Sequence, residues 1–162
     1  MIVALDVDYR DDHALAAAVA FERWTDERAT CSWTALTRDI APYVSGRFAE
    51  RELPPLVAVL ALAPVAPTVL IVDGYVWLAE GVAGLGEHLA DVTGLPVVGV
   101  AKRARTGAPA VPVLRGASQR PLWVTSHGVA DAAEHVRTMH GPHRLPTLLK
   151  LVDTLARSLG SQ

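Results

Sequence analysis

Three acidic residues stand where they could hold a metal ion. Asp6 lies in an apolar run near the amino terminus, Asp73 directly follows the apolar run 68–72, and Glu52 opens an apolar segment between them. If the two runs are neighbouring strands, Asp6 and Asp73 can face each other, with Glu52 supplied by a nearby helix terminus. Carboxylate oxygens suit hard cations such as Mg²⁺ or Mn²⁺, which can activate water and neutralise charge on a phosphodiester.

The alternative is that the aspartates cap turns and that Glu52 is a first-turn acid favoured by the helix dipole. Spacing alone favours this alternative.

Lys102 is the basic residue whose position best matches these carboxylates. It follows the apolar run 96–100. If that run is a strand parallel to the one before Asp73, both residues stand at the carboxyl edge of the sheet, where ligands bind. A lysine there could hold a scissile phosphate or balance the carboxylates. Further arginines could extend a positive patch or be ordinary charges of a solvated loop: Arg103, Arg105, Arg115 and Arg120.

The composition is that of a globular domain. The 162 residues are 51% hydrophobic and 20% charged, which allows a real core and argues against disorder. We therefore predict a single domain over residues 1–162. The formal net charge of −2 excludes a globally basic nucleic-acid binder, so any such function must rest on a local patch. A single cysteine, Cys31, excludes a disulfide framework, and its surroundings favour a packed strand residue over a nucleophile.

No segment has the pattern of a membrane span. The most apolar stretch, residues 53–70, is interrupted by Pro54, Pro55, Pro64 and Pro67, which suit a helix start and a loop better than a continuous span. The amino terminus lacks the basic region of a signal peptide. We therefore expect a soluble cytoplasmic protein without a membrane partner.

The predicted elements follow one another as in an α/β domain. Strands are predicted over residues 2–9, 13–24, 30–36, 68–72, 96–100, 111–114 and 121–125, and helices over 52–62, 84–93, 130–139 and 146–158. The alanines within 13–24 favour a helix by propensity. The short polar turn before them and the strand after them favour a meander of three antiparallel strands, which we expect. The strand–helix–strand order from 68 to 100 predicts a parallel pair with a right-handed crossover.

Several of these residues lie in motifs that resemble those of the endonuclease V family. Residues 4–9 resemble the family's first-strand motif, and residues 71–74 its metal-binding Asp-Gly strand end. Residues 42–46 and 51–55 are similar to its Tyr-x-Pro-Gly wedge and its Arg-Glu-Ile-Pro helix start. Residues 94–102 are close to its Ile-Pro-x-Ile-Gly-Val-Ala-Lys run, and Arg144-Leu145-Pro146 resembles a later element. The motifs occur in the family's order over nearly the whole chain.

The resemblance implies an RNase H-like fold: a mixed sheet in which three antiparallel strands are followed by parallel strands, flanked by helices. It implies a metal-dependent endonuclease that cleaves 3′ to a deaminated base, inosine, in DNA or RNA during nucleic-acid repair. The implied ligands of Mg²⁺ or Mn²⁺ are Asp6, Glu52 and Asp73, with His127 as a fourth. Lys102 would steady the phosphate as a catalytic residue. The implied nucleic-acid contacts are Tyr43 on the wedge loop, Gly46, Gly74 and Lys102.

The chain also departs from the family pattern. The family's Asp-Gly-His-Gly becomes Asp73-Gly74-Tyr75-Val76, and its His-Pro-Arg becomes Ala79-Glu80-Gly81, which removes basic contacts and adds an acid that should repel phosphate. Ser45 replaces the wedge proline, and Glu50 replaces a phenylalanine. The order Ser126-His127-Gly128 places the late histidine one position away from the family's.

These departures leave other hypotheses open. A non-cleaving relative could act as a nucleic-acid or protein binding module. A nuclease of this fold could also act on another substrate, such as a structured or single-stranded nucleic acid. His127 itself could be an ordinary loop histidine rather than a ligand.

Overall fold

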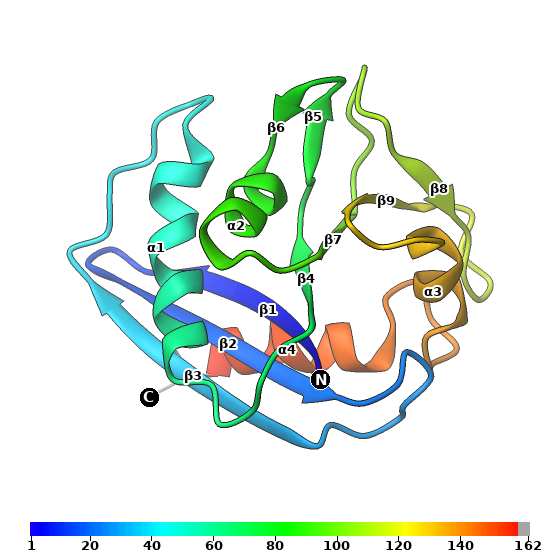
Figure 1. Cartoon of the computed structure of the whole chain (residues 1–162), viewed down its shortest axis with the longest axis horizontal. Helices are drawn as coiled ribbons and strands as arrows, with labels where there is room; N and C mark the ends of the chain where they lie inside the picture. Colours follow the sequence, from blue (N-terminus) through cyan, green and yellow to red (C-terminus); the bar gives the residue numbers. More distant parts are fainter. Residues whose placement is uncertain (159–162) are drawn as a thin grey trace.

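A seven-stranded mixed sheet forms the centre of the fold, which a computed structural model describes for residues 1–158 (Figure 1). Its strands are β1 (Ile2–Tyr9), β2 (His13–Phe21), β3 (Cys31–Arg38), β4 (Val69–Asp73), β7 (Val97–Ala101), β8 (Val111–Val113) and β9 (Leu122–His127). The helices are α1 (Phe48–Ala61), α2 (Leu85–Thr93), α3 (Ala132–Thr138) and α4 (Thr147–Arg157), and β5 (Trp77–Ala79) pairs with β6 (Val82–Ala83) in a separate hairpin.

The strand order β3-β2-β1-β4-β7-β9-β8 confirms the predicted α/β fold with a mixed sheet. β1, β2 and β3 form the antiparallel meander, β1 pairs in parallel with β4, and β4 pairs in parallel with β7. The alanine-rich segment is a strand, as expected, although it ends at Phe21. Tertiary position decides its conformation over helix propensity, because β2 is buried between two strands and its small side chains let helices pack closely on both faces.

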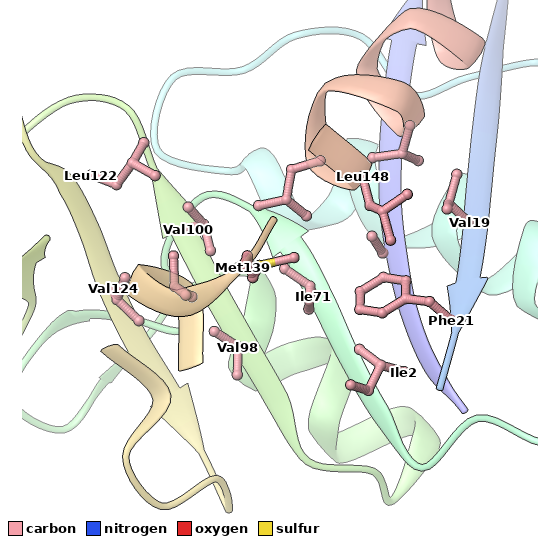
Figure 2. Close-up of a cluster of buried hydrophobic side chains, with 14 of the residues drawn as sticks. Ile2, Val19, Phe21, Ile71, Val98, Val100, Leu122, Val124, Met139 and Leu148 are labelled. Atoms are coloured by element: carbon pink, nitrogen blue, oxygen red, sulfur yellow. The ribbon is translucent and has the colours of Figure 1, made fainter. Parts of the chain in front are cut away.

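Helices cover both faces of the sheet. On one face, α1 and α2 pack on β1, β2 and β4 through side chains that include Leu56, Val59 and Leu89. On the other face, α3 and α4 pack on the same strands and on β7 and β9. Figure 2 shows this second core, in which Leu148 of α4 and Met139 lie over Ile71 and Phe21. No helix within residues 1–158 has the length and apolarity needed to cross a bilayer.

Helix α1 begins at Phe48, not at Glu52 as predicted, so Pro54 and Pro55 lie inside the helix. Proline has no backbone N–H, and Pro55 therefore cannot donate to the carbonyl oxygen of Arg51 one turn earlier. The hydroxyl of Tyr9, at the end of β1, donates to that oxygen instead, at 3.4 Å. The carbonyl oxygen that Pro55 leaves free thus links the end of β1 to the turn of α1 that carries Glu52.

The hairpin β5–β6 is an element that the sequence patterns did not predict. It follows Gly74, whose φ of 133° disfavours other residues, and the chain then crosses β7 at Gly99. A Cβ at Gly99 would stand 2.5 Å from the Gly74 carbonyl oxygen. The backbone N–H of Val76 donates to Oγ1 of Thr125 in β9 at 2.8 Å. These contacts aim the hairpin away from the sheet, at the edge where the strand-end aspartates lie.

Arg115 is buried and fixes the connection between α3 and α4. Its side chain is 5% exposed and donates to five backbone carbonyl oxygens, those of Arg137, Met139, Gly141, His143 and Arg144. It therefore does not extend a positive patch at the surface. By holding this connection, it sets where α4 begins.

The Arg115→Lys substitution is expected to lower the free energy of unfolding by about 2–4 kcal/mol, because lysine lacks the fork of donors and leaves buried carbonyl groups unsatisfied. Chemical denaturation monitored by circular dichroism measures this change. Arg120→Lys, the same change at an exposed residue, should have almost no effect. Equal stability of the two variants would contradict the clamping role.

Candidate functional site

Asp6 and Asp73 lie side by side at the carboxyl edge of the sheet. β1 and β4 are paired in parallel up to Leu5 and Val72, so the next residue on each strand is one of the two aspartates. Asp73 is exposed, and Asp6 is half-buried. One oxygen of Asp6 accepts a hydrogen bond from the Val7 backbone N–H at 2.9 Å. The structure thus brings together the two aspartates, Asp6 within β1 and Asp73 at the end of β4, that the sequence predicted to face each other.

Glu52 reaches this pair from α1. A cavity of about 150 Å³ is lined by Asp6, Glu52 and Asp73 and also by Tyr9. The Tyr9 ring lies under the Arg51 guanidinium, whose Cζ is 4.2 Å from the ring centroid. Together with the hydrogen bond from Tyr9 to the helix backbone, this stacking fixes the turn of α1 on which Glu52 sits. All three predicted carboxylates therefore face one cavity.

Asp153 is a further carboxylate at the site that the sequence patterns missed. It is 6% exposed on α4 and lines a cavity of about 20 Å³ with Asp6, Asp73 and Lys102, on the opposite face of the sheet from Glu52. Its oxygens pair with Arg157 at 3.0 Å and with Lys150 at 3.5 Å. The sequence signal that could have identified Asp153 is an acid on the apolar face of a predicted amphipathic helix. A carboxylate buried there needs a partner, which points to a functional or paired residue.

The carboxylates carry more negative charge than the nearby lysine compensates. Burial, followed by the charge of Asp73, raises the pKa of Asp6 to about 7, and Asp153 adds to the effect while Lys102 opposes it. Burial and the charge of Asp73 also raise the pKa of Glu52 above its ordinary value. Strongly perturbed carboxyl groups in a cavity are typical of functional sites.

The donor set fits a hard divalent cation. All the donors are carboxylate oxygens, the ligand type preferred by Mg²⁺ and Mn²⁺, and a cation would relieve their repulsion. Within residues 1–158, no three His, Cys, Asp or Glu side chains form a ready-made group that could hold a metal ion. An ion here would therefore keep waters or take substrate oxygens among its ligands, as Mg²⁺ commonly does.

Lys102 lies where it was predicted, beside the aspartates. Asp73 pairs with Val100 in the parallel register of β4 and β7, so Lys102 follows just beyond the strand end on the same side. Its Nζ is 3.3 Å from Oδ2 of Asp73, and its side chain is 38% exposed. The ammonium group is therefore placed at the mouth of the site.

The structure does not bring His127 to the carboxylates. His127 pairs with Val97 at the beginning of β7, whereas Asp73 pairs with Val100 near its end. The two residues therefore lie beside opposite ends of β7. Nδ1 of His127 is 2.7 Å from a carboxylate oxygen of Glu87 on α2. The expectation of a fourth ligand at His127 is corrected, because β9 runs antiparallel to β7 and its carboxyl end, which carries His127, lies beside the beginning of β7.

A groove of about 810 Å³ opens beside the carboxylates. This main groove is lined by Gly46 and Phe48, by Glu52 and Asp73, and by Leu78 and Arg105, among others. It runs between the start of α1 and the hairpin β5–β6. Gly74 also lines it, so two glycines predicted to contact nucleic acid border the same space.

Tyr43 packs against Phe48, which lines the main groove. Its ring is 59% exposed and packs edge-on against the Phe48 ring, with centroids 5.5 Å apart. The Arg51 guanidinium lies 5.9 Å from the Tyr43 ring centroid. The structure therefore places an exposed aromatic pair next to the groove that leads to the carboxylates.

Comparisons with known proteins agree with this arrangement. A family model described as Endonuclease V matches residues 1–145. The endonuclease V of Streptomyces avermitilis is 32% identical over 181 residues, which cover 96% of this chain and 79% of that protein. The endonuclease V of Thermus thermophilus is 34% identical over 182 residues, which cover 93% of this chain and 78% of that protein.

Solved structures give the same result for the fold. The crystal structure of the Streptomyces avermitilis protein has a TM-score of 0.78 and covers 98% of this chain and 80% of its own. Endonuclease V of Ciona intestinalis, crystallised with a 23mer DNA containing an inosine followed by a ribo-adenosine, has a TM-score of 0.82 at 19% identity, with 98% and 84% of the two chains covered.

Proposed function

The chain belongs to the endonuclease V family of nucleases, and from that premise we propose that it is a Mg²⁺- or Mn²⁺-dependent endonuclease that hydrolyses a phosphodiester 3′ to inosine in DNA or RNA. The partner is then an inosine-containing nucleic acid, the class of ligand bound in the Ciona intestinalis complex. A non-cleaving binding module is not favoured, because the acidic residues expected at the metal site are present.

The observation that carries this proposal is the convergence of Asp6, Glu52 and Asp73 on one cavity at the carboxyl edge of the sheet. These residues come from three separate elements, and a purely structural role would not require three acids, two of them half-buried, to face one cavity. Asp153 adds a fourth carboxylate from the opposite face. A divalent ion held there, when bound, would neutralise phosphate charge and make a bound water more acidic.

The remaining chemistry is assigned to residues of the chain. In hydrolysis, a water oxygen forms a bond to phosphorus, and a phosphorus–oxygen ester bond in line with it breaks. Lys102 at the mouth of the site donates to a phosphate oxygen, where an ammonium group stabilises the charge that develops. The carboxylates do not contact the reacting phosphate themselves and would orient it through the divalent ion that they hold. Arg51 and Tyr9 hold the turn of α1 that carries Glu52.

Tyr43 and the main groove are assigned to the modified base. Base-specific enzymes extrude their target nucleotide into a pocket and stack aromatic residues against the bases that remain. The exposed ring of Tyr43 beside the groove, with Gly46 and Gly74 on the groove wall, supports this role. Glycines at these places let a nucleotide approach the backbone closely.

The test is a nicking assay on inosine-containing DNA and RNA oligonucleotides with Mg²⁺ or Mn²⁺. The wild-type protein is expected to cleave on the 3′ side of inosine, and chelation by EDTA is expected to abolish cleavage. Asp73→Ala is expected to lose activity. Cleavage that persists unchanged in Asp73→Ala would overturn the assignment of the metal site, and absence of any cleavage by the wild type would overturn the proposed reaction.

A further inference from the structure

The main groove contains few cations that are free to meet a phosphate backbone. Its carboxylates include Glu50, Glu52 and Asp73. Arg47, which also lines it, already pairs with Glu50, its Nη2 being 2.8 Å from a carboxylate oxygen. Arg105 is different: the structure gives it no carboxylate partner within residues 1–158. A polyanionic strand entering this groove therefore meets Arg105 as an uncompensated positive charge.

Two hydrogen bonds fix the loop that carries Arg105. The Tyr75 hydroxyl donates to the carbonyl oxygen of Arg103 at 2.5 Å, and Nε of Arg105 donates to the carbonyl oxygen of Leu78 at 3.3 Å. The loop after β7 is thereby tied to the chain leading into the hairpin β5–β6. Figure 1 shows this loop and the hairpin standing next to each other beyond the sheet. The guanidinium is held in place against the groove wall before any ligand arrives.

We propose that Arg105 binds a phosphate of the substrate strand and replaces the positive charge that the hairpin lacks. This inference rests on the proposed function. The hairpin turn reads Ala79-Glu80-Gly81, which offers no cation and one acid. Arg105 contacts the same hairpin at Leu78, so its positive charge stands where the hairpin would otherwise only repel a phosphate.

A phosphate fits Arg105 better than the edge of a base does. Nε is already engaged with Leu78, which leaves the two terminal nitrogens, and these can donate a pair of hydrogen bonds to one phosphate. The residue is exposed on the loop after β7 and lines the main groove. Contacts to the nucleic-acid backbone position the strand and carry no sequence information directly.

The test compares Arg105→Ala with the wild type and with Arg28→Ala, the same change at an exposed residue on the β2–β3 connection. The probe is an inosine-containing single-stranded oligonucleotide. Its dissociation constant is measured with Ca²⁺ in place of Mg²⁺ at salt concentrations from about 50 to 200 mM, and kcat and KM are measured with Mg²⁺.

For Arg105→Ala, we expect KM to rise about tenfold at low salt, with kcat changed less than about twofold. The slope of log affinity against log salt should fall by about 0.7. Arg105→Lys should keep most of the slope.

Each outcome decides the inference. An unchanged salt slope for Arg105→Ala, or a change equal to that of Arg28→Ala, overturns the phosphate contact. Loss of the preference for inosine over adenosine with an unchanged slope would assign Arg105 to base reading and also overturns it. In both cases a wild-type enzyme that cleaves the probe leaves the proposed function intact. A wild-type protein that neither binds nor cleaves the probe overturns the proposed function and this inference together.

Discussion

Asp6→Asn is expected to abolish cleavage and, in the metal-free protein, to raise the stability of the fold. Asparagine has nearly the same shape and can still accept the hydrogen bond from the Val7 N–H, but it removes a buried negative charge next to Asp73 and Asp153. If Asp6 holds the metal ion as proposed, its loss should lower kcat/KM by about three orders of magnitude or more. The relief of repulsion and desolvation should add about 1–3 kcal/mol to the free energy of unfolding.

The gain in stability should depend on pH in a defined direction. The pKa of Asp6 is raised in the folded protein to about 7, from an ordinary value of 3.8. Ionised Asp6 therefore destabilises the wild-type fold, by an amount that grows as the pH rises from about 4 to about 7 and then stays level. Thermal unfolding of both proteins in EDTA should show the variant's advantage to be larger at pH 8 than at pH 5.

A matched control separates this effect from a general effect of removing charge. Asp91→Asn makes the same change on the exposed surface of α2 and should leave both cleavage and stability nearly unchanged. Added Mg²⁺ should raise the melting temperature of the wild type by mass action and that of Asp6→Asn much less. If the metal-free Asp6→Asn protein melts below the wild type, the crowded carboxylates are not a source of strain in the fold.

The sheet could be predicted from the sequence because its strands are short apolar runs with polar ends. The meander and the parallel pair β4–β7 follow from such runs and from connection length. Propensity alone would have made β2 a helix, and its burial between β1 and β3 overrides that tendency. The hairpin β5–β6 escaped prediction because two very short strands carry no alternating pattern, and the glycine-dependent crossing at Gly99 that aims them is a tertiary contact.

The functional residues were predictable where local position fixes their geometry. Asp6 and Asp73 directly follow the last paired residues of β1 and β4, and Lys102 directly follows β7, so their proximity follows from the parallel pairing of these strands. Asp153 could not be placed in this way, because its approach depends on how α4 packs across the sheet, and the match to the family model ends at Leu145, before that helix. His127 was misplaced because β9 runs antiparallel to β7, so the carboxyl end of β9 lies beside the beginning of β7 and away from Asp73.

Lys102→Ala is the second substitution expected to have a large effect on activity. If the ammonium group donates to the reacting phosphate, its removal should lower kcat by about 10²–10³-fold, the loss typical of one donor that stabilises transition-state charge. Lys102→Arg should recover only part of this activity, because the planar guanidinium places its charge differently. Single-turnover cleavage at saturating enzyme measures the chemical step directly, and Arg28→Ala controls for the loss of one positive charge.

The metal dependence of Lys102→Ala decides between its two possible roles. Nζ lies 3.3 Å from Asp73, so the lysine could merely balance the carboxylates rather than contact substrate. In either role its removal leaves the carboxylates more negative, and the concentration of Mg²⁺ needed for half-maximal activity should stay the same or fall. A lysine that only balanced charge would then be dispensable, and kcat at saturating Mg²⁺ would match the wild type. A kcat that stays low at every Mg²⁺ concentration places the ammonium group on the phosphate, because no amount of cation at the carboxylates can replace a donor on the other side of the reacting group.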